Sequence, residues 1–346
     1  MSDAGAAGAP PRRRRVALLV GLWLALLALA LVVGPGELRV GDVAAILGHH
    51  LGLIDAAPSP IADAIVWELR LPRALLVTLI GAALGCAGAI TQGIFRNPLA
   101  EPGVLGIASG AALFAVIGFA LGADALGPWA TAGLAAAGAT SILALLLGFI
   151  GARIDVATLL LSGVAVAALT SAITTLILAL ASQRWDLGLR VLHWMMGSFE
   201  GRSWAHLSIA APLVGAGLGL GLWIRRDLDV LFLGADTARS LGVDLRRLHV
   251  SAIAAIGLLV GCATALTGII GFVGLVVPHL ARRLAGPGHR TLLPLSALIG
   301  AGALLLVDTG ARSVSGVVIP PGVITSLLGA PFFLWILWRQ RPRAEV

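Results

Sequence analysis

Apolar stretches of about 20 residues recur along the whole chain, and this pattern restricts the fold more than any other feature. A helix of that length crosses the hydrocarbon core of a bilayer and satisfies its own backbone hydrogen bonds there. Only 12% of the 346 residues are charged and the mean hydropathy is +0.99, so the chain lacks the polar surface of a soluble protein. We therefore predict an all-α, polytopic membrane protein, whose 45 glycines suit close helix packing in lipid.

The apolar stretches predict ten membrane spans, at residues 16–34, 73–95, 103–122, 128–150, 156–181, 206–224, 248–266, 272–284, 292–310 and 321–338. The eighth is short and contains Pro278, so we expect it to be broken or partly re-entrant. An even number of spans places both termini on the same side. The predicted organisation is a tail at 1–15, a single transmembrane domain at 16–340 and a second tail at 341–346.

Arginine placement predicts the orientation of these spans. All 24 basic residues are arginines. With the N-terminus inside, 17 of the 24 lie in inner segments and 7 in outer segments, as the positive-inside rule requires. We therefore expect both termini, and both tails, in the cytoplasm. The same bias accounts for the net charge of +7 without a nucleic acid partner.

Two arginines, Arg70 and Arg73, precede the second predicted span in the stretch WELRLPR. A helix start is an unfavourable place for a cation, because the helix dipole is already positive there. Both arginines are predicted to lie outside, where they either meet carboxylates of a soluble partner or snorkel to the membrane interface. The residues alone favour neither alternative. Asp308 lies within the ninth span, four residues before Arg312, which predicts a local ion pair near the outer interface.

Two inner segments differ from ordinary connections. The stretch FRNPLAEPGVLGIASGAA, residues 95–112, contains Pro98 and Pro102, which cannot both lie in one unbroken helix. We predict a structured turn at the inner membrane face, with an ordinary connection between helices as the alternative. The segment 225–247 is long and charged, and DTARSLG within it indicates a short helical turn. Two short helices lying against the inner membrane face would fit this segment.

Missing residue types restrict the chemistry. A Walker A P-loop requires a lysine, and the sequence contains none, so any ATPase that drives this protein must be a separate polypeptide. A self-sufficient secondary transporter is the alternative, but it would be expected to carry more ionisable groups within its spans. Cys86 and Cys262 lie in apolar runs and are predicted to be buried and unpaired. We predict no metal site, no cofactor and no catalytic residues.

Several segments resemble, in the same order, those of the FecCD-type permeases of type II ABC importers, which move iron–siderophore complexes, haem and cobalamin. They include LRLPRALLVTLIGAALGCAGAITQGIFRNPLAEPGVLGIASGAAL, HWMMGSFEGRSW, LGADTARSLGV and IPPGVITSLLGAPFFLWIL. The similarity covers roughly residues 65–340, and cobalamin-transporting members look especially similar around RLPR, NPLAEPG and WMMG.

The resemblance implies a permease subunit in the bacterial inner membrane, with ten helices and no enzyme activity of its own. It further implies a second permease copy, an ABC ATPase dimer on the inside and a periplasmic substrate-binding protein outside, with membrane lipid around the spans. The cargo would be an iron chelate, as a siderophore or haem complex, or cobalamin. The resemblance does not decide between these substrates.

The resemblance also implies roles for particular residues. Those that would dock the binding protein are Arg70, Arg73 and Arg312. Those that would form the inner gate are Asn97 and Leu99. Those that would couple the chain to the ATPase, within the inner loop 225–247, are Leu233, Gly234, Ala238, Leu241 and Gly242. Cobalamin-transporting members carry hydroxyl residues of the gate at the start of their fifth helix, whereas this chain has Val156 and Ala157 there.

Overall fold

The computed structural model describes residues 12–34, 36, 38–55, 58–148, 156–181, 185–314 and 319–339. Within these ranges every regular element is a helix. Most of the predicted N-terminal tail and all of the predicted C-terminal tail lie outside the described residues. The two proposed tails therefore have no structural description.

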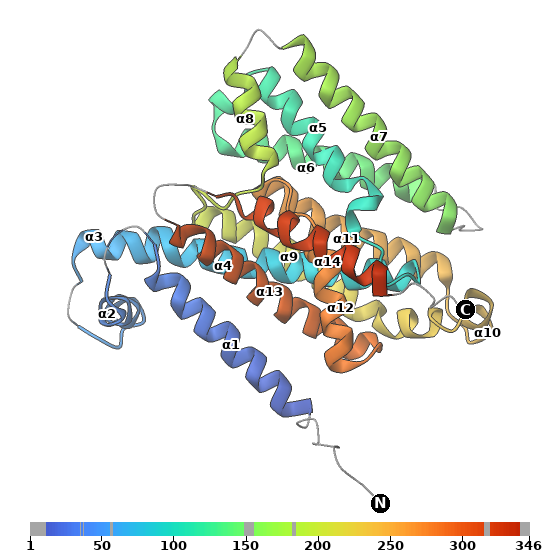
Figure 1. Ribbon diagram of the computed structural model, residues 1–346, viewed down its shortest axis with the longest axis horizontal. Coiled ribbons are helices and arrows are strands. Elements are labelled where there is room, and N and C mark those ends of the chain that lie inside the picture. The colour runs from blue at the N-terminus through green and yellow to red at the C-terminus, as the bar shows by residue number, and fades with distance from the viewer. Residues whose placement is uncertain are drawn as a thin grey trace, which may run out of the picture.

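The ten predicted spans each correspond to a helix (Figure 1). Eight helical segments are long and apolar enough to cross a membrane, and two shorter helices, α5 and α12, stand at the third and eighth predicted spans. The ten helices are α1 (Arg12–Val32), α4 (Leu71–Ile94), α5 (Ile107–Ala120), α6 (Pro128–Gly148), α7 (Val156–Leu180), α9 (Trp204–Leu231), α11 (Leu245–Thr267), α12 (Val273–Ala285), α13 (His289–Ser313) and α14 (Pro321–Arg339). The prediction of an all-α polytopic membrane protein is confirmed.

Short helices fill the connections. Those of α type are α2 (Val40–His50), α3 (Pro60–Asp63), α8 (Trp185–Met195) and α10 (Ala235–Ser240). The others are the π-helical turn η1 (Ala64–Arg70) and the 3-10 turns η2 (Pro102–Leu105) and η3 (Ala123–Leu126). We call the two ends of the bundle the α2 end and the α10 end after the short helices that lie there (Figure 1).

The second span begins earlier than the sequence pattern predicted. α3, η1 and α4 form one continuous helical segment from Pro60 to Ile94. Pro60 suits the first helical position, because its missing N–H would have no partner there. Arg70 and Arg73 therefore lie well inside a helix. The expectation that they oppose the dipole of a helix start is wrong, since that effect is confined to the first turn.

α4 and α11 form the centre of the bundle. In an 18-residue apolar stretch of each long helix, the buried share is 78% for the segment containing α4 and 83% for α11. The corresponding share is 11% for α1 and 17% for α7. α13 packs along α4, and the two backbones approach closely where Gly81 meets Gly300. A Cβ atom on either glycine would overlap the carbonyl oxygen of the other, so this crossing depends on glycine.

The break next to the eighth span lies before α12. α11 ends at Thr267, Gly268 has φ of 75° and Phe272 has φ of 65°. Pro278 lies inside α12 and does not interrupt it. The prediction of a short eighth helix is confirmed, but the irregular backbone occupies residues 268–272, where Gly268 accommodates a positive φ and Phe272 adopts the left-handed conformation.

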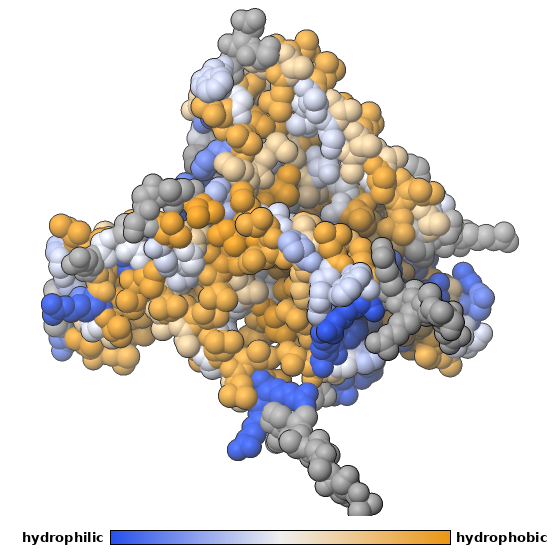
Figure 2. All heavy atoms as spheres, in the orientation of Figure 1, coloured by the Kyte–Doolittle hydropathy of each residue, from blue (hydrophilic) through white to orange (hydrophobic). Residues whose placement is uncertain are grey.

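Apolar side chains cover the flanks of the bundle, as Figure 2 shows. Hydrophilic residues gather near α2, around α10 and where α1 begins. Many of the exposed large apolar side chains lie on α1, α7 and α14. This distribution is that of a bundle whose flanks face lipid and whose two ends face water.

Candidate transport sites at the two ends of the bundle

A buried carboxylate joins two arginines at the α2 end. Asp308 on α13 is fully buried, and its Oδ1 lies 2.8 Å from Arg73 Nη2 on α4. Its Oδ2 lies 3.2 Å from Arg312 Nε, one helical turn further along α13. The predicted pair between Asp308 and Arg312 is confirmed. The second partner, Arg73, lies 235 positions earlier in the chain and could not be found from spacing.

Arg70 donates hydrogen bonds to backbone carbonyls near the end of α1. Its Nη1 donates to the carbonyls of Leu31 and Val32, at 2.8 and 2.7 Å. Its Nη2 donates to the carbonyls of Gly34 and Gly36, at 3.2 and 3.1 Å. The last carbonyls of a helix have no partner within it and form the negative end of its dipole. Arg70 therefore complements the end of α1.

Arg312 contributes to the same arrangement. It donates to the carbonyls of Ala30 and Val33, at 3.2 and 3.1 Å. The structure thus brings together all three residues predicted to dock the binding protein, and it gives each guanidinium an internal partner. Only 5% of Arg70 is exposed. Direct docking by these arginines stays a prediction, and it would require an incoming carboxylate to displace contacts within the chain.

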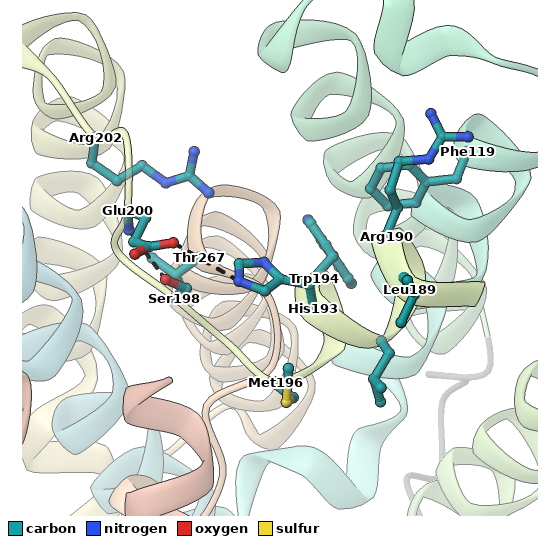
Figure 3. Close-up of a pocket in the computed structure, with 11 residues that line it drawn as sticks. Phe119, Leu189, Arg190, His193, Trp194, Met196, Ser198, Glu200, Arg202 and Thr267 are labelled. Carbon is teal, nitrogen blue, oxygen red and sulfur yellow. Dashed lines mark hydrogen bonds and ion pairs between the residues drawn. The ribbon is translucent and has the colours of Figure 1, made fainter. Parts of the chain in front are cut away.

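A cavity of about 550 Å³ lies between α8 and the loop that leads to α9 (Figure 3). His193 on α8 points toward Glu200 on that loop, with 3.8 Å between Nε2 and Oε2. Arg202 also lines the cavity, and its Nε is buried without a hydrogen-bond partner among the described residues. Burial lowers the pKa of Arg202, and the positive charge of Arg73 lowers it further. Sequence reasoning did not identify this cavity.

The inner turn is held by Asn97. Its Oδ1 accepts a hydrogen bond from the backbone N–H of Leu99 at 2.9 Å, and its carbonyl accepts one from Ala100 at 3.1 Å. This local closure is typical of an Asx turn. Asn97 is exposed and Leu99 is half-buried. The predicted structured turn is confirmed, and its role as a gate stays a prediction.

Sequence reasoning missed Glu101, which connects this turn to the break before α12. Its Oε1 accepts a hydrogen bond from the backbone N–H of Phe272 at 2.7 Å. Burial raises the pKa of the Glu101 carboxyl, and the hydrogen bond from Phe272 opposes that rise. The two irregular segments of the bundle, 95–106 and 268–272, are therefore linked by a side chain. No sequence signal placed the two segments together.

The predicted coupling segment contains one short helix rather than two. α9 continues to Leu231, so the first half of the 225–247 segment extends a membrane helix. α10 follows, between Gly234 with φ of 117° and Gly242 with φ of 83°. A second short helix was expected because the boundary of α9 was placed too early. The apolar residues of α9 end near 224, but its helical hydrogen bonding continues through the charged turn that follows.

The coupling segment exposes apolar side chains at the α10 end. Leu233 and Leu241 are 66% and 63% exposed, whereas Ala238 between them is fully buried. Exposed leucines on an otherwise charged segment are typical of a surface that contacts another protein.

A pair that sequence reasoning missed ties the coupling segment to the bundle. Asp229, near the end of α9, accepts hydrogen bonds from the backbone N–H of His289 and lies 2.7 Å from its Nδ1. His289 begins α13 and is 2% exposed. Asp229 therefore caps α13 and joins its start to the helix that leads into α10.

Comparison with known proteins gives one consistent relationship. The model of the FecCD transport family matches residues 22–339. The vitamin B12 import system permease protein BtuC of Escherichia coli O9:H4 (strain HS) is 41% identical over 288 residues, which cover 82% of this chain and 86% of that protein. The protein of the same name from Escherichia coli O127:H6 (strain E2348/69 / EPEC) is 42% identical over 284 residues, covering 81% and 85%.

A solved structure shows the same fold. It is an inward-facing transporter assigned to the metal-chelate type of ABC transporter, with a TM-score of 0.83 and 30% sequence identity. The match covers 94% of this chain and 99% of that one. Together with the helical bundle, these similarities show that the chain belongs to the FecCD transport family, as a permease subunit of a type II ABC importer.

Proposed function

We propose that this permease imports cobalamin or an iron chelate, in the form of a siderophore or haem complex, from periplasm to cytoplasm. The observation that carries this proposal is the identity of 41% to vitamin B12 import permeases across most of both chains. That identity favours cobalamin among the three cargoes.

Orientation and partners complete the proposal. Both termini lie in the cytoplasm of a bacterial inner-membrane protein, with the transmembrane domain at 16–340 between tails at 1–15 and 341–346. A second permease copy completes the transport path, an ABC ATPase dimer binds the α10 end, and a periplasmic substrate-binding protein binds the α2 end. The exposed Leu233 and Leu241 support an ATPase contact within a surface that also includes Gly234, Ala238 and Gly242.

The binding protein docks on a surface at the α2 end, whose shape is fixed by the contacts of Arg70, Arg73 and Arg312. Arg70 and Arg312 hold the end of α1, and Arg73 is the most accessible of the three, with 17% of its side chain exposed. An incoming carboxylate reaches Arg73 with less rearrangement than it would need at Arg70. The docking role therefore combines one direct contact with two residues that fix the shape of the surface.

The inner gate is formed by Asn97 and Leu99. The turn that carries them lies next to α4 and is connected through Glu101 to the start of α12, so it can follow movements of either helix. Ala157 is exposed at the start of α7, while the side chain of Val156 lies outside the described residues. Without hydroxyl groups at these two positions, we expect the turn at Asn97 to make the main closure.

A secondary transporter would need a buried group that exchanges a proton or an ion. Asp308 is the buried carboxylate that could serve, but it lies between Arg73 and Arg312 and its ionised form is compensated. This arrangement supports a structural role for Asp308. ATP hydrolysis by a partner is therefore the favoured source of energy.

A reconstituted uptake assay tests the proposal. The complete importer, placed in proteoliposomes with ATP in the lumen, would receive labelled cobalamin, a ferric siderophore or haem on its binding protein. We expect ATP-dependent accumulation of one cargo and none with a hydrolysis-deficient ATPase. Accumulation driven by a proton gradient without ATP would instead establish a secondary transporter.

A further inference from the structure

A groove between α1 and α13 belongs to none of the sites described above. It has a volume of about 260 Å³ and lies near the start of both helices. Its lining includes Arg15 and Leu19 of α1, Leu284 of α12, and Arg290, Leu295 and Leu298 of α13. Charge is therefore confined to two residues, and the rest of the lining is largely apolar.

The two arginines lie at the same end of the groove. Arg15 is the fourth residue of α1, and Arg290 is the second residue of α13. Leu298 follows Arg290 by eight residues, a rise of about 12 Å along the helix. The groove thus passes from a basic end near the membrane surface to apolar walls deeper in the bundle.

Local contacts fix the basic end. Arg15 Nη1 donates to the carbonyl of Leu284 at 2.8 Å, which holds its guanidinium beside the end of α12. Arg290 is exposed. Asp229 contacts His289, the residue before Arg290. Its carboxylate accepts a hydrogen bond from the backbone of His289 and lies against its ring. Among the described residues that line the groove, none carries a carboxylate.

Two arginines at one end and apolar walls beyond them restrict which ligand the groove can bind. A phosphate requires positive charge at the membrane surface, and an acyl chain requires an apolar channel that leads inward. Basic pockets between transmembrane helices suit anionic lipid headgroups. A soluble anion would use the arginines but not the apolar walls, and a neutral acyl chain would use the walls but not the arginines.

We propose that the groove binds an anionic phospholipid, with its phosphate between Arg15 and Arg290 and an acyl chain along Leu19, Leu295 and Leu298. The lipid would fill the space between α1 and α13. α1 is the least buried of the long apolar helices, with 11% of its most apolar window buried. Occupancy would therefore fix the first turns of α1, whose other end is held by Arg70 and Arg312.

Lipid binding to the purified full-length chain tests this proposal. Native mass spectrometry would compare phosphatidylglycerol with phosphatidylcholine carrying the same acyl chains. We expect a preference for phosphatidylglycerol on the order of tenfold, because each basic residue near an anionic headgroup contributes substantially to binding. The double variant Arg15→Gln, Arg290→Gln should lose this preference.

A matched control removes the same charge elsewhere. Arg226 and Arg283 are exposed arginines near the α10 end that do not line the groove. The Arg226→Gln, Arg283→Gln variant should keep the preference. An equal loss in both double variants would show a general charge effect and overturn the site, as would an unchanged preference in the groove variant.

Two further variants separate loss of lipid binding from misfolding and from binding of a soluble anion. Arg290→Gln alone changes an exposed side chain, so it should fold and still weaken phosphatidylglycerol binding several-fold. Leu298→Trp should fill the apolar part of the groove and reduce binding while both arginines remain. If glycerol 3-phosphate competes equally well with the lipid, or if Leu298→Trp has no effect, the apolar groove has no part in binding and the proposal is wrong.

Discussion

Arg70 donates to four backbone carbonyls near the end of α1, at distances of 2.7–3.2 Å. Its buried charge is therefore compensated within the chain. Sequence spacing could find the pair between Asp308 and Arg312, because both lie on one helix. It could not find these carbonyl partners of Arg70, because they are main-chain atoms 34–39 positions away, which residues of any type would provide.

Replacing Arg70 should therefore affect stability before it affects docking. We expect Arg70→Gln to lower the unfolding temperature of the detergent-solubilised chain by several degrees, since hydrogen bonds to a charged group each contribute roughly 1.5–3 kcal/mol. Arg39→Gln, at an exposed arginine of the same end, should leave it unchanged. An unaltered unfolding temperature with slower association of the binding protein would place the main role of Arg70 in docking.

Asp308 should show strong energetic coupling to Arg73. Asp308→Asn leaves the half-buried Arg73 and Arg312 without this counter-charge and should destabilise the chain by about 3–5 kcal/mol. Arg73→Gln in the same background should cost much less than it does alone, because its partner is already missing. Unfolding measurements on the two single variants and the double variant test this. Strictly additive effects would mean that the ion pair contributes little.

At the scale of elements, the apolar pattern predicted each membrane helix but misplaced several ends. The early start of the second span was missed because Ala64–Arg70 forms a π-helical turn, which blurs the ordinary helical period. The end of α9 was missed because charged residues continue a helix whose apolar face has already ended. α10 was predicted correctly, since Gly234 and Gly242 mark its limits in the sequence.

The coupling segment should be sensitive to the backbone at Gly242. Its φ of 83° strains any β-branched residue, so Gly242→Val should shift α10 and reduce both uptake and stimulated ATP hydrolysis severalfold. Gly288→Val is the matched control, because Gly288 has φ of −66° and open space around it. Uptake and hydrolysis in the reconstituted importer would be measured for both. Normal uptake and normal ATP hydrolysis in Gly242→Val would show that this segment does not form the ATPase contact.

The inner turn should approach its copy at one stage of the cycle. Cysteines at Asn97 or Leu99 in two permease copies should crosslink in a nucleotide-dependent way. The native Cys86 and Cys262 are buried and give little background. Ser240→Cys, at an exposed position of α10, should not crosslink between permeases. Crosslinking at the turn that ignores nucleotide would indicate a static connection.

At the scale of the whole molecule, the fold and the transport class could be predicted, whereas the internal contacts could not. Span length and arginine bias depend on local composition, which the sequence displays directly. The contact between Glu101 and Phe272 and that between Asp229 and His289 join segments far apart in the chain. Such pairs depend on how helices cross, and a single sequence does not record the crossing.

The purified chain should hydrolyse no ATP. It contains no lysine to contact nucleotide phosphates in a P-loop, so phosphate release should stay at background until the cognate ATPase subunit is added. A hydrolysis-deficient ATPase variant controls for contaminating activity. Turnover by the permease alone, persisting after repeated purification, would contradict the assignment of a transport subunit.

The arginines around the end of α1 also affect how the protein is made. α1 and α4 are synthesised long before the end of α13, because Arg73 precedes Asp308 by 235 positions and Ala30 precedes Arg312 by 282. Until then Arg73 has no counter-charge, and the last carbonyls of α1 lack two of their donors. A chain that stops before the end of α13 therefore carries an incomplete polar cluster, with a charge that is costly to bury without its partner.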